Sequence, residues 1–318
     1  NVTSTVTVHA ANGLLIDGGN DVTLTTTGTT SGTTAVGATT AAAGDVTVTL
    51  NSALAANGTN GTVAVTGGDS INISQVAANA VNTTTTFGAV TATGNASTTT
   101  VTVSQTAEAV AAAAVSGVVN GTVAVTDANL ATASDTITSV TLSNQGNATI
   151  TSSVLSDLSI TGGATAALAS GTITIDKSAA DASTAATTLN LSGSGFHGAL
   201  DGTAADVYTT VNVVATSALT IADVNLAAAT TINASGAGIA TIMSTFALQD
   251  TTTLPVAGLV TFGSPRVGNW QFGNHIDANI KHIRWVNHND CITKSPPNLF
   301  GRYVEEKFDR NFRVNREM

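Results

Sequence analysis

The chain has 318 residues, a formal net charge of −10 and only 9% charged residues. Residues 1–250 contain 14 acidic residues and one lysine, a balance of −13, whereas residues 251–318 contain nine basic and six acidic residues, a balance of +3. An acidic surface without arginine repels phosphate, which argues against a nucleic-acid partner for the larger part. The single cysteine excludes an internal disulfide, and no apolar run is long enough to span a membrane.

Residues 1–134 alternate between apolar and polar side chains with a period of two, which predicts half-buried β-strands. Val46 and Val48 alternate with threonine in this way, and so do Val101 and Val103. Asn-Gly and Gly-Gly pairs between these runs are typical of turns. The alanine-rich stretch 105–115 is compatible with a strand or a helix. We therefore expect repetitive β-sandwich-like modules over residues 1–134.

Internal repeats indicate how the strands are organised. Residues 60–66 recur identically at 120–126, which indicates a duplicated β unit. From residue 135 the period shortens to about 20 residues, as expected of a β-solenoid over residues 135–250. A β-sandwich of short strands is the alternative. Thr-Thr-Leu/Val/Ile-Asn recurs at 187–190, 209–212 and 230–233, which predicts that Leu189, Val211 and Ile232 occupy equivalent inward positions and that Asn190, Asn212 and Asn233 face outward or form a side ladder.

The repeated segments over residues 1–245 resemble the β-strand-repeat proteins of Gram-negative bacterial surfaces, including S-layer-like proteins and large adhesins. The resemblance rests on Thr-Val-Thr-Val at 100–103, on the Asn-Gly-Thr-Val-Ala-Val-Thr unit at 120–126 and on the Thr-Thr-Leu-Asn repeats. It implies an exported, extracellular or cell-surface protein that self-assembles into a homo-oligomer or lattice. A cell-surface polysaccharide is a further candidate partner.

A candidate metal site lies near the N-terminus. Asp17 and Asp21 flank Gly18-Gly19-Asn20, and this turn resembles half of a glycine-rich calcium repeat. A calcium site and a plain Asx turn are the two interpretations, and no other cofactor is expected. The remaining candidates are better explained as packed, solvated or turn residues than as ligands or acid–base pairs: His9, His197, Asp201 and Asp206.

Residues 251–318 have a different pattern. An apolar strand at 258–262 runs into Gly263-Ser264-Pro265, residues 269–281 carry apolar side chains at helical spacing, and residues 282–287 form a second apolar strand. This order predicts a short βαβ unit. Asp290 follows the second strand, with Pro296-Pro297 beyond it.

Residues 255–300 resemble the class 3 (fungal-type) triacylglycerol lipases, which are α/β-hydrolases. In that family the Thr-Phe-Gly-x-Pro-Arg-Val-Gly-Asn turn, here 261–269, precedes a helix and a strand that ends in the catalytic acid. By this resemblance Asp290 corresponds to the acid of a Ser–His–Asp triad. The sequence contains no Gly-x-Ser-x-Gly elbow, and no histidine follows His288. We therefore expect Asp290 to be catalytically silent, with His275, His282 and His288 as ordinary polar residues.

The sequence as a whole predicts an all-β protein with three parts: modules at 1–134, a solenoid at 135–250 and a lipase-like βαβ segment with a charged tail at 251–318. The expected function is structural and not enzymatic, namely a surface lattice, coat or adhesive stalk acting by self-assembly. The alternative is part of a class 3 lipase-type serine hydrolase whose nucleophile and histidine are missing from this chain. A composite of two unrelated pieces is the third interpretation.

Overall fold

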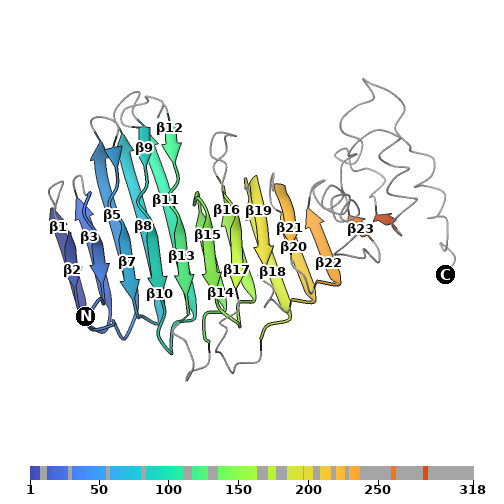
Figure 1. Ribbon diagram of the computed structural model, residues 1–318, viewed down its shortest axis with the longest axis horizontal. Helices are drawn as coiled ribbons and strands as arrows, with labels where there is room; N and C mark the ends of the chain where they lie inside the picture. Colours follow the sequence, from blue (N-terminus) through green and yellow to red (C-terminus); the bar gives the residue numbers. More distant parts are fainter. Residues whose placement is uncertain are drawn as a thin grey trace, which may run out of the picture.

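A computed structural model describes residues 1–7, 13–27, 31–54, 58–79, 84–109, 117–127, 135–162, 171–176, 185–195, 197–202, 208–215, 220–225, 229–236, 259–262 and 282–285. Within these ranges every regular element is a β-strand, so the all-β prediction is confirmed. The strands stack side by side in chain order (Figure 1). None of the described residues forms a helix that could cross a membrane.

Two large parallel sheets make up the body of the fold. The strands of the ten-stranded sheet, in spatial order, are β1 (Val2–Thr7), β3 (Val22–Thr27), β5 (Val46–Leu54), β8 (Ser70–Asn79), β11 (Thr100–Ala109), β14 (Ser139–Ser143), β16 (Asp157–Thr161), β18 (Thr188–Ser194), β20 (Thr210–Ala215) and β22 (Thr231–Gly236). The strands of the nine-stranded sheet are β2 (Leu14–Ile16), β4 (Thr34–Val36), β7 (Val63–Thr66), β10 (Val90–Thr93), β13 (Val123–Thr126), β15 (Ala148–Thr151), β17 (Ile173–Asp176), β19 (His197–Gly202) and β21 (Thr220–Asn225).

Along the chain, strands of one large sheet alternate with strands of the other. One coil is one full turn of the chain, and it contributes one strand to each large sheet. Every pairing between neighbouring coils is parallel, which is the geometry of a β-solenoid. The prediction of a solenoid over 135–250 is confirmed for its described strands. The same two sheets also run without interruption through residues 1–134. In this region the two sheets face each other as in the expected sandwich. The chain passes from one sheet to the other in every coil, however, which is the connectivity of a solenoid.

Three central coils carry an additional strand each. β6 (Gly58–Thr59), β9 (Thr84–Thr86) and β12 (Gly117–Val119) form a short third sheet in the order β12-β9-β6. These coils also have the longest strands, β8 and β11, at ten residues each. The part of the ambiguous 105–115 stretch that the structure describes, Gln105–Ala109, belongs to strand β11.

The repeated unit at 60–66 and 120–126 occupies equivalent places in the fold. Val63 pairs with Val90 and Val90 pairs with Val123, so the two copies lie two coils apart with β10 between them. The 60-residue repeat is therefore two three-strand coils, because one coil alone accounts for half of that length. The shorter Thr-Thr repeats later in the chain correspond to single coils without the third strand.

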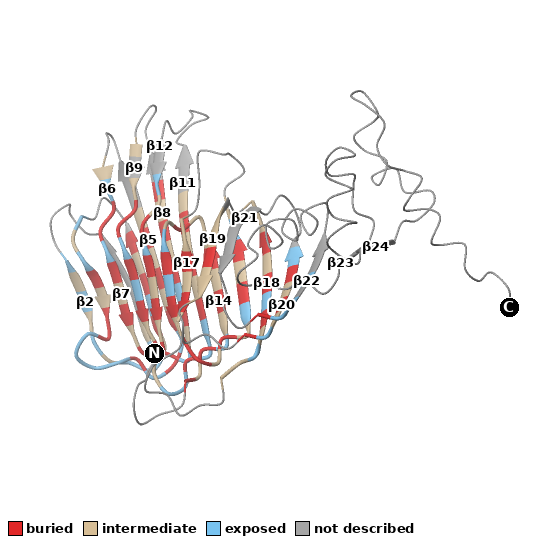
Figure 2. Ribbon diagram, turned by 45° about the vertical axis from the view of Figure 1, so that its right-hand side comes forward, coloured by how far each residue is buried: buried red, intermediate tan, exposed pale blue. Residues whose placement is uncertain are grey.

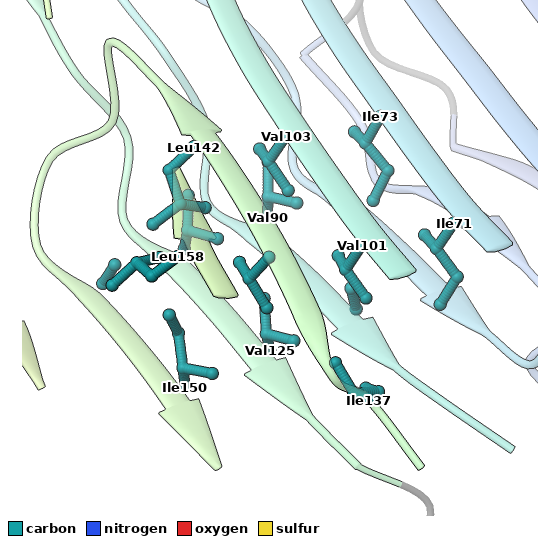
Figure 3. Packing of buried hydrophobic residues seen from close by; sticks show 14 of the residues in the cluster. Ile71, Ile73, Val90, Val101, Val103, Val125, Ile137, Leu142, Ile150 and Leu158 are labelled. Atoms are coloured by element: carbon teal, nitrogen blue, oxygen red, sulfur yellow. The ribbon is translucent and has the colours of Figure 1, made fainter. Parts of the chain in front are cut away.

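The core is the thin layer between the two large sheets. Alternate residues of each strand point inward, as the period of two requires. Figure 3 shows Ile71, Ile73, Val101 and Val103 of the ten-stranded sheet in this layer together with Val125 and others of the nine-stranded sheet. All of these side chains are at most 1% exposed. Figure 2 shows the same buried band along the strands. Because each coil contributes only a few aliphatic side chains, neighbouring coils must stack to bury them.

A stack of glycines forms one edge of the central coils. A Cβ atom on Gly61 would overlap the carbonyl oxygen of Gly32, one on Gly88 would overlap that of Gly61, and one on Gly121 would overlap that of Gly88. These positions need glycine because the backbones of successive coils approach too closely for any side chain.

A buried glutamine ladder supports this edge. Gln75 and Gln105 are paired in register and are 0% and 1% exposed. Gln105 Nε2 donates to Gln75 Oε1 over 2.7 Å, and Gly121 N donates to Gln105 Oε1 over 2.9 Å. Gln75 Nε2 donates to the carbonyl oxygens of Gly61 and Gly88 over 3.1 and 3.3 Å. The glutamine amides thus provide hydrogen-bond partners for the buried carbonyl oxygens of Gly61 and Gly88 and for the N–H of Gly121.

The predicted register of the last coils is confirmed. Leu189 pairs with Val211, and Val211 pairs with Ile232. The side chains of Leu189 and Val211 are buried. The asparagine that follows each of them forms the predicted side ladder on the outside: Asn212 Nδ2 donates to Asn190 Oδ1 and Asn233 Nδ2 donates to Asn212 Oδ1, both over 2.9 Å.

Candidate functional site

Asp17 binds backbone amides of the next coil. Its Oδ1 accepts hydrogen bonds from Thr39 N at 2.7 Å and from Thr40 N at 3.3 Å. The amide of Thr39, more than that of Thr40, holds the pKa of the fully exposed Asp17 carboxyl below its ordinary value. Gly18 and Gly19 adopt positive φ angles of 71° and 99°, which explains the two glycines of this turn.

Asp21 has a similar role one turn later in the chain. Its Oδ1 accepts hydrogen bonds from Asn20 Nδ2 at 3.1 Å and from Asp45 N at 3.2 Å. Asp17 and Asp21 therefore both use a carboxylate oxygen to hold the backbone of the neighbouring coil, 22 to 24 residues away, and these bonds are not those of a local Asx turn. Within the described ranges, no group of three or more His, Cys, Asp or Glu side chains is placed to bind a metal ion. The calcium site at Asp17 and Asp21 stays a prediction.

Of the other candidates, the structure describes His197, Asp201 and His282, and His282 begins strand β24. His197 and Asp201 both belong to β19, where Asp201 pairs with Thr174 of β17. His9, Asp206, Ser264, His275, His288 and Asp290 lie outside the described residues. Among the described candidates, the structure brings together no nucleophile, base and acid.

Sequence reasoning missed a buried carboxylate at the end of β13. Asp127 is 2% exposed, and its Oδ2 accepts hydrogen bonds from Thr136 N at 2.8 Å, Ile137 N at 2.7 Å and Ser152 Oγ at 3.0 Å. These donors lie before β14 and after β15, so Asp127 ties three successive parts of the chain together. The sequence indicates this residue only as an aspartate directly after an apolar strand. The same pattern is found at ordinary turns, so it does not identify a buried carboxylate. Its contacts are those of a structural carboxylate.

The strands of the C-terminal segment are paired in parallel. β23 (Leu259–Phe262) and β24 (His282–Trp285) run in register from Leu259–His282 to Phe262–Trp285. Two adjacent parallel strands require a crossover connection of a dozen or more residues, and residues 263–281 provide it. The helix expected within that connection lies outside the described residues.

This pairing fixes the relative direction of the strands that precede the two motif segments. Because Phe262 and Trp285 are register partners, the chain after each strand leaves from the same end of the small sheet. The Gly263-Ser264-Pro265-Arg266 turn follows the first strand, and Asp290 comes five residues after the second. In open parallel sheets, ligands bind outside the carboxyl ends of the strands. The two motif segments therefore follow, in the sequence, the carboxyl ends of two strands that run side by side in the same direction.

Residues 234–300 match the family model of class 3 lipases. No curated protein matches the chain. The match confirms the lipase part of the resemblance, and it contains both the 261–269 turn and Asp290. The similarity of residues 1–245 to S-layer-like and adhesin repeats stays an interpretation of their composition and repeats.

The match also corrects the expected function. The sequence predicts a structural surface protein acting by self-assembly as the main function and a lipase-type hydrolase as the alternative. The family match falls on the lipase-like segment, so it supports the alternative better than the structural function. The prediction was wrong because it weighted the long repetitive region above the short segment in which specific chemistry is encoded.

Proposed function

We propose that this chain contributes part of a class 3 lipase-type serine hydrolase, an esterase acting on acyl esters. The observation that carries the proposal is the family match over residues 234–300. The parallel, in-register pairing of β23 with β24 supports it, because an α/β-hydrolase needs this geometry to direct an acid toward the nucleophile.

Each residue of the segment has a role in this proposal. Asp290 is the acid that orients and stabilises a catalytic imidazole, which a carboxylate at the end of a strand can do. The turn at 261–269 shapes the loop beside it. The nucleophilic serine and the histidine base are the two groups that the 318 residues do not supply in the family's sequence context. We therefore predict that the 318-residue chain by itself does not hydrolyse esters.

The solenoid is the scaffold in this proposal. Its last strand in the ten-stranded sheet, β22, ends at Gly236, and the family match begins at residue 234. The hydrolase segment thus starts where the last described coil ends. The extracellular location and the homo-oligomer expected from the sequence stay predictions.

The test begins with the coding sequence on both sides of the 318 residues. The protein encoded by the complete gene is expressed and assayed for hydrolysis of a short-chain nitrophenyl ester and of an emulsified triacylglycerol. We expect a Gly-x-Ser-x-Gly segment, a histidine downstream of Asp290 and measurable hydrolysis. Asp290→Asn should reduce the rate by about 10³–10⁴-fold, because the imidazole loses its orienting partner.

Asp309→Asn is the matched control, since Asp309 lies beyond the family match and carries the same change of charge. It should retain full activity. Absence of hydrolysis by the complete protein, or full activity of Asp290→Asn, would overturn the proposal. Labelling of the protein by a fluorophosphonate separately identifies whether an activated serine is present.

A further inference from the structure

The outer face of the ten-stranded sheet, from β3 to β18, carries two columns of small polar side chains. Both columns follow from the register of the strands, because residues paired across parallel strands lie side by side on the same face. The first column is Thr23, Thr47, Asn72, Thr102, Thr141, Ser159 and Ser192, and the second is Thr25, Thr49, Ser74, Ser104, Ser143, Thr161 and Ser194.

The two columns form a two-dimensional array. Each pair, such as Thr102 and Ser104, is separated by one inward residue, so both members of the pair face outward. The array repeats about every 4.7–4.9 Å from strand to strand and about every 6.6–6.8 Å along a strand. Every position is a hydroxyl residue except Asn72, and none is charged. The acids nearest to the array, Asp45 and Asp157, lie two residues before Thr47 and Ser159 at its margin, and their carboxylates accept hydrogen bonds from Ser70 Oγ and Asn190 Nδ2.

These hydroxyls are free to bond outside the protein. Of the fourteen side chains, Ser104 alone has a side-chain hydrogen bond within the described part of the chain, a long one of 3.5 Å to Thr106 Oγ1. The neighbouring asparagine column differs, because Asn190, Asn212 and Asn233 bond to one another at 2.9 Å. The array therefore presents a regular grid of groups that can each donate and accept.

The nine-stranded sheet does not have such a face. Its outward column runs through Leu15, Ala35, Ala64, Thr91 and Ala124, which are in register with one another. Leu15 is 57% exposed. A second outward column carries a hydroxyl on four successive strands, at Thr66, Thr93, Thr126 and Thr151. The column beside it alternates between alanine and threonine on these strands, so two unbroken hydroxyl columns do not lie side by side there. The array is thus a property of one side of the solenoid.

We propose that the hydroxyl array of the ten-stranded sheet binds the surface of crystalline ice. Water in ice is tetrahedral, so two oxygens bonded to a common third lie about 4.5 Å apart when each O–H···O bond is about 2.75 Å, and the repeat across two puckered layers is about 7.3 Å. The strand spacing and the two-residue spacing of the sheet agree with these two repeats within about a tenth. Both periods occur together on this face.

Two properties favour ice over a soluble polymer as the occupant. A single polymer chain needs one row of contacts, whereas this face has two rows in register over seven strands. Charged side chains hold their own hydration water, which does not fit a lattice of neutral water molecules, and the array contains none. An uncharged and doubly periodic surface thus complements an uncharged and doubly periodic crystal.

The experiment measures how much of the 318-residue chain enters polycrystalline ice grown slowly from solution. We expect the wild-type chain to be enriched in the ice fraction. Thr102→Lys places a charge in the centre of the array and should abolish this enrichment. Thr149→Lys is the matched control, because Thr149 is exposed on strand β15 of the nine-stranded sheet. It should enter ice like the wild type.

Far-UV circular dichroism checks that each variant keeps the wild-type fold. If Thr102→Lys unfolds the chain, Thr141→Tyr replaces it, since a bulky neutral side chain also disrupts the grid. Exclusion of the wild-type chain from ice would overturn the proposal, and so would equal ice binding by all variants. Retention of the chain on insoluble cellulose together with exclusion from ice would likewise overturn it in favour of a periodic polysaccharide.

Discussion

The buried glutamine ladder and the exposed asparagine ladder use the same amide chemistry in opposite surroundings. Gln105 Nε2 donates to Gln75 Oε1 over 2.7 Å in the interior, and Asn212 Nδ2 donates to Asn190 Oδ1 over 2.9 Å on the outer face. Both bonds join residues in register on adjacent coils. Outside, water replaces a lost bond, whereas inside nothing does. The two ladders look alike, but losing a hydrogen bond of the buried ladder should cost much more stability than losing one of the exposed ladder.

The position of each ladder follows from the length of its coil. In the central coils the long strands extend past the aliphatic core, and Leu50, Gln75 and Gln105 follow one another in register. The column changes from an aliphatic to an amide side chain where the glycine stack leaves backbone groups to be satisfied. The later coils are shorter, and there the amides lie on the outside beside the core column of Leu189 and Val211.

The largest effect is expected from breaking the buried ladder. Gln105→Ala leaves Gln75 Oε1 and Gly121 N without these partners in the interior. We expect a loss of about 3 kcal/mol in the free energy of unfolding, because each buried unsatisfied group costs about 1–3 kcal/mol. Urea unfolding of the two chains measures the difference. The half-buried Thr106, next in sequence on β11, provides the control Thr106→Ala, and an equal loss for both variants would contradict the interior role of the ladder.

Truncating the core beside the exposed ladder should have the next largest effect. Val211→Ala should cost about 2 kcal/mol, because buried aliphatic atoms are lost and a cavity remains. Hydrogen exchange should become faster around residues 187–233 before it does in distant coils, since each coil is stabilised by its neighbours. Val214→Ala on the same strand is the control, because Val214 is 49% exposed. Unchanged exchange in this region would contradict the coupling of adjacent coils.

Breaking the exposed ladder should have a smaller effect. Asn212 is the middle member and bonds to both Asn190 and Asn233. Asn212→Ala should cost about 1 kcal/mol or less, because water takes the place of the lost amide. Urea unfolding again measures the change. A larger loss of stability for Asn212→Ala than for the buried Val211→Ala would contradict the view that burial determines the energetic cost of each change.

The smallest effect is expected for Asp17, and it should depend on pH. The hydrogen bonds from Thr39 N and Thr40 N hold the folded-state pKa of this carboxyl below its ordinary value. The charged form then stabilises the fold at pH values above the ordinary pKa, and this contribution disappears as pH falls through the lowered folded-state pKa. The stability difference between the wild type and Asp17→Asn should therefore shrink in acid. A difference that stays constant between neutral pH and strong acid would contradict this role.

Much of the solenoid could be predicted from the residues. The period of two determines which side chains share a face, and the Thr-Thr-x-Asn repeats predicted that Leu189, Val211 and Ile232 are equivalent, as their register confirms. The motif at 261–269 and Asp290 indicate the lipase-like segment from the residues alone. These features are local, because a strand's alternation and a motif's order are written in neighbouring residues.

The tertiary structure alone decided how those strands are connected. Alternation does not encode whether a neighbouring strand is parallel, so residues 1–134 read as sandwich-like modules although they continue the solenoid. The partnership of Gln75 with Gln105, 30 residues apart, depends on the length of the coil between them. The buried position of Asp127 depends on Thr136 and Ser152 arriving from later coils. Residues far apart in sequence meet only when each coil returns to the same edge, and no local pattern records that distance.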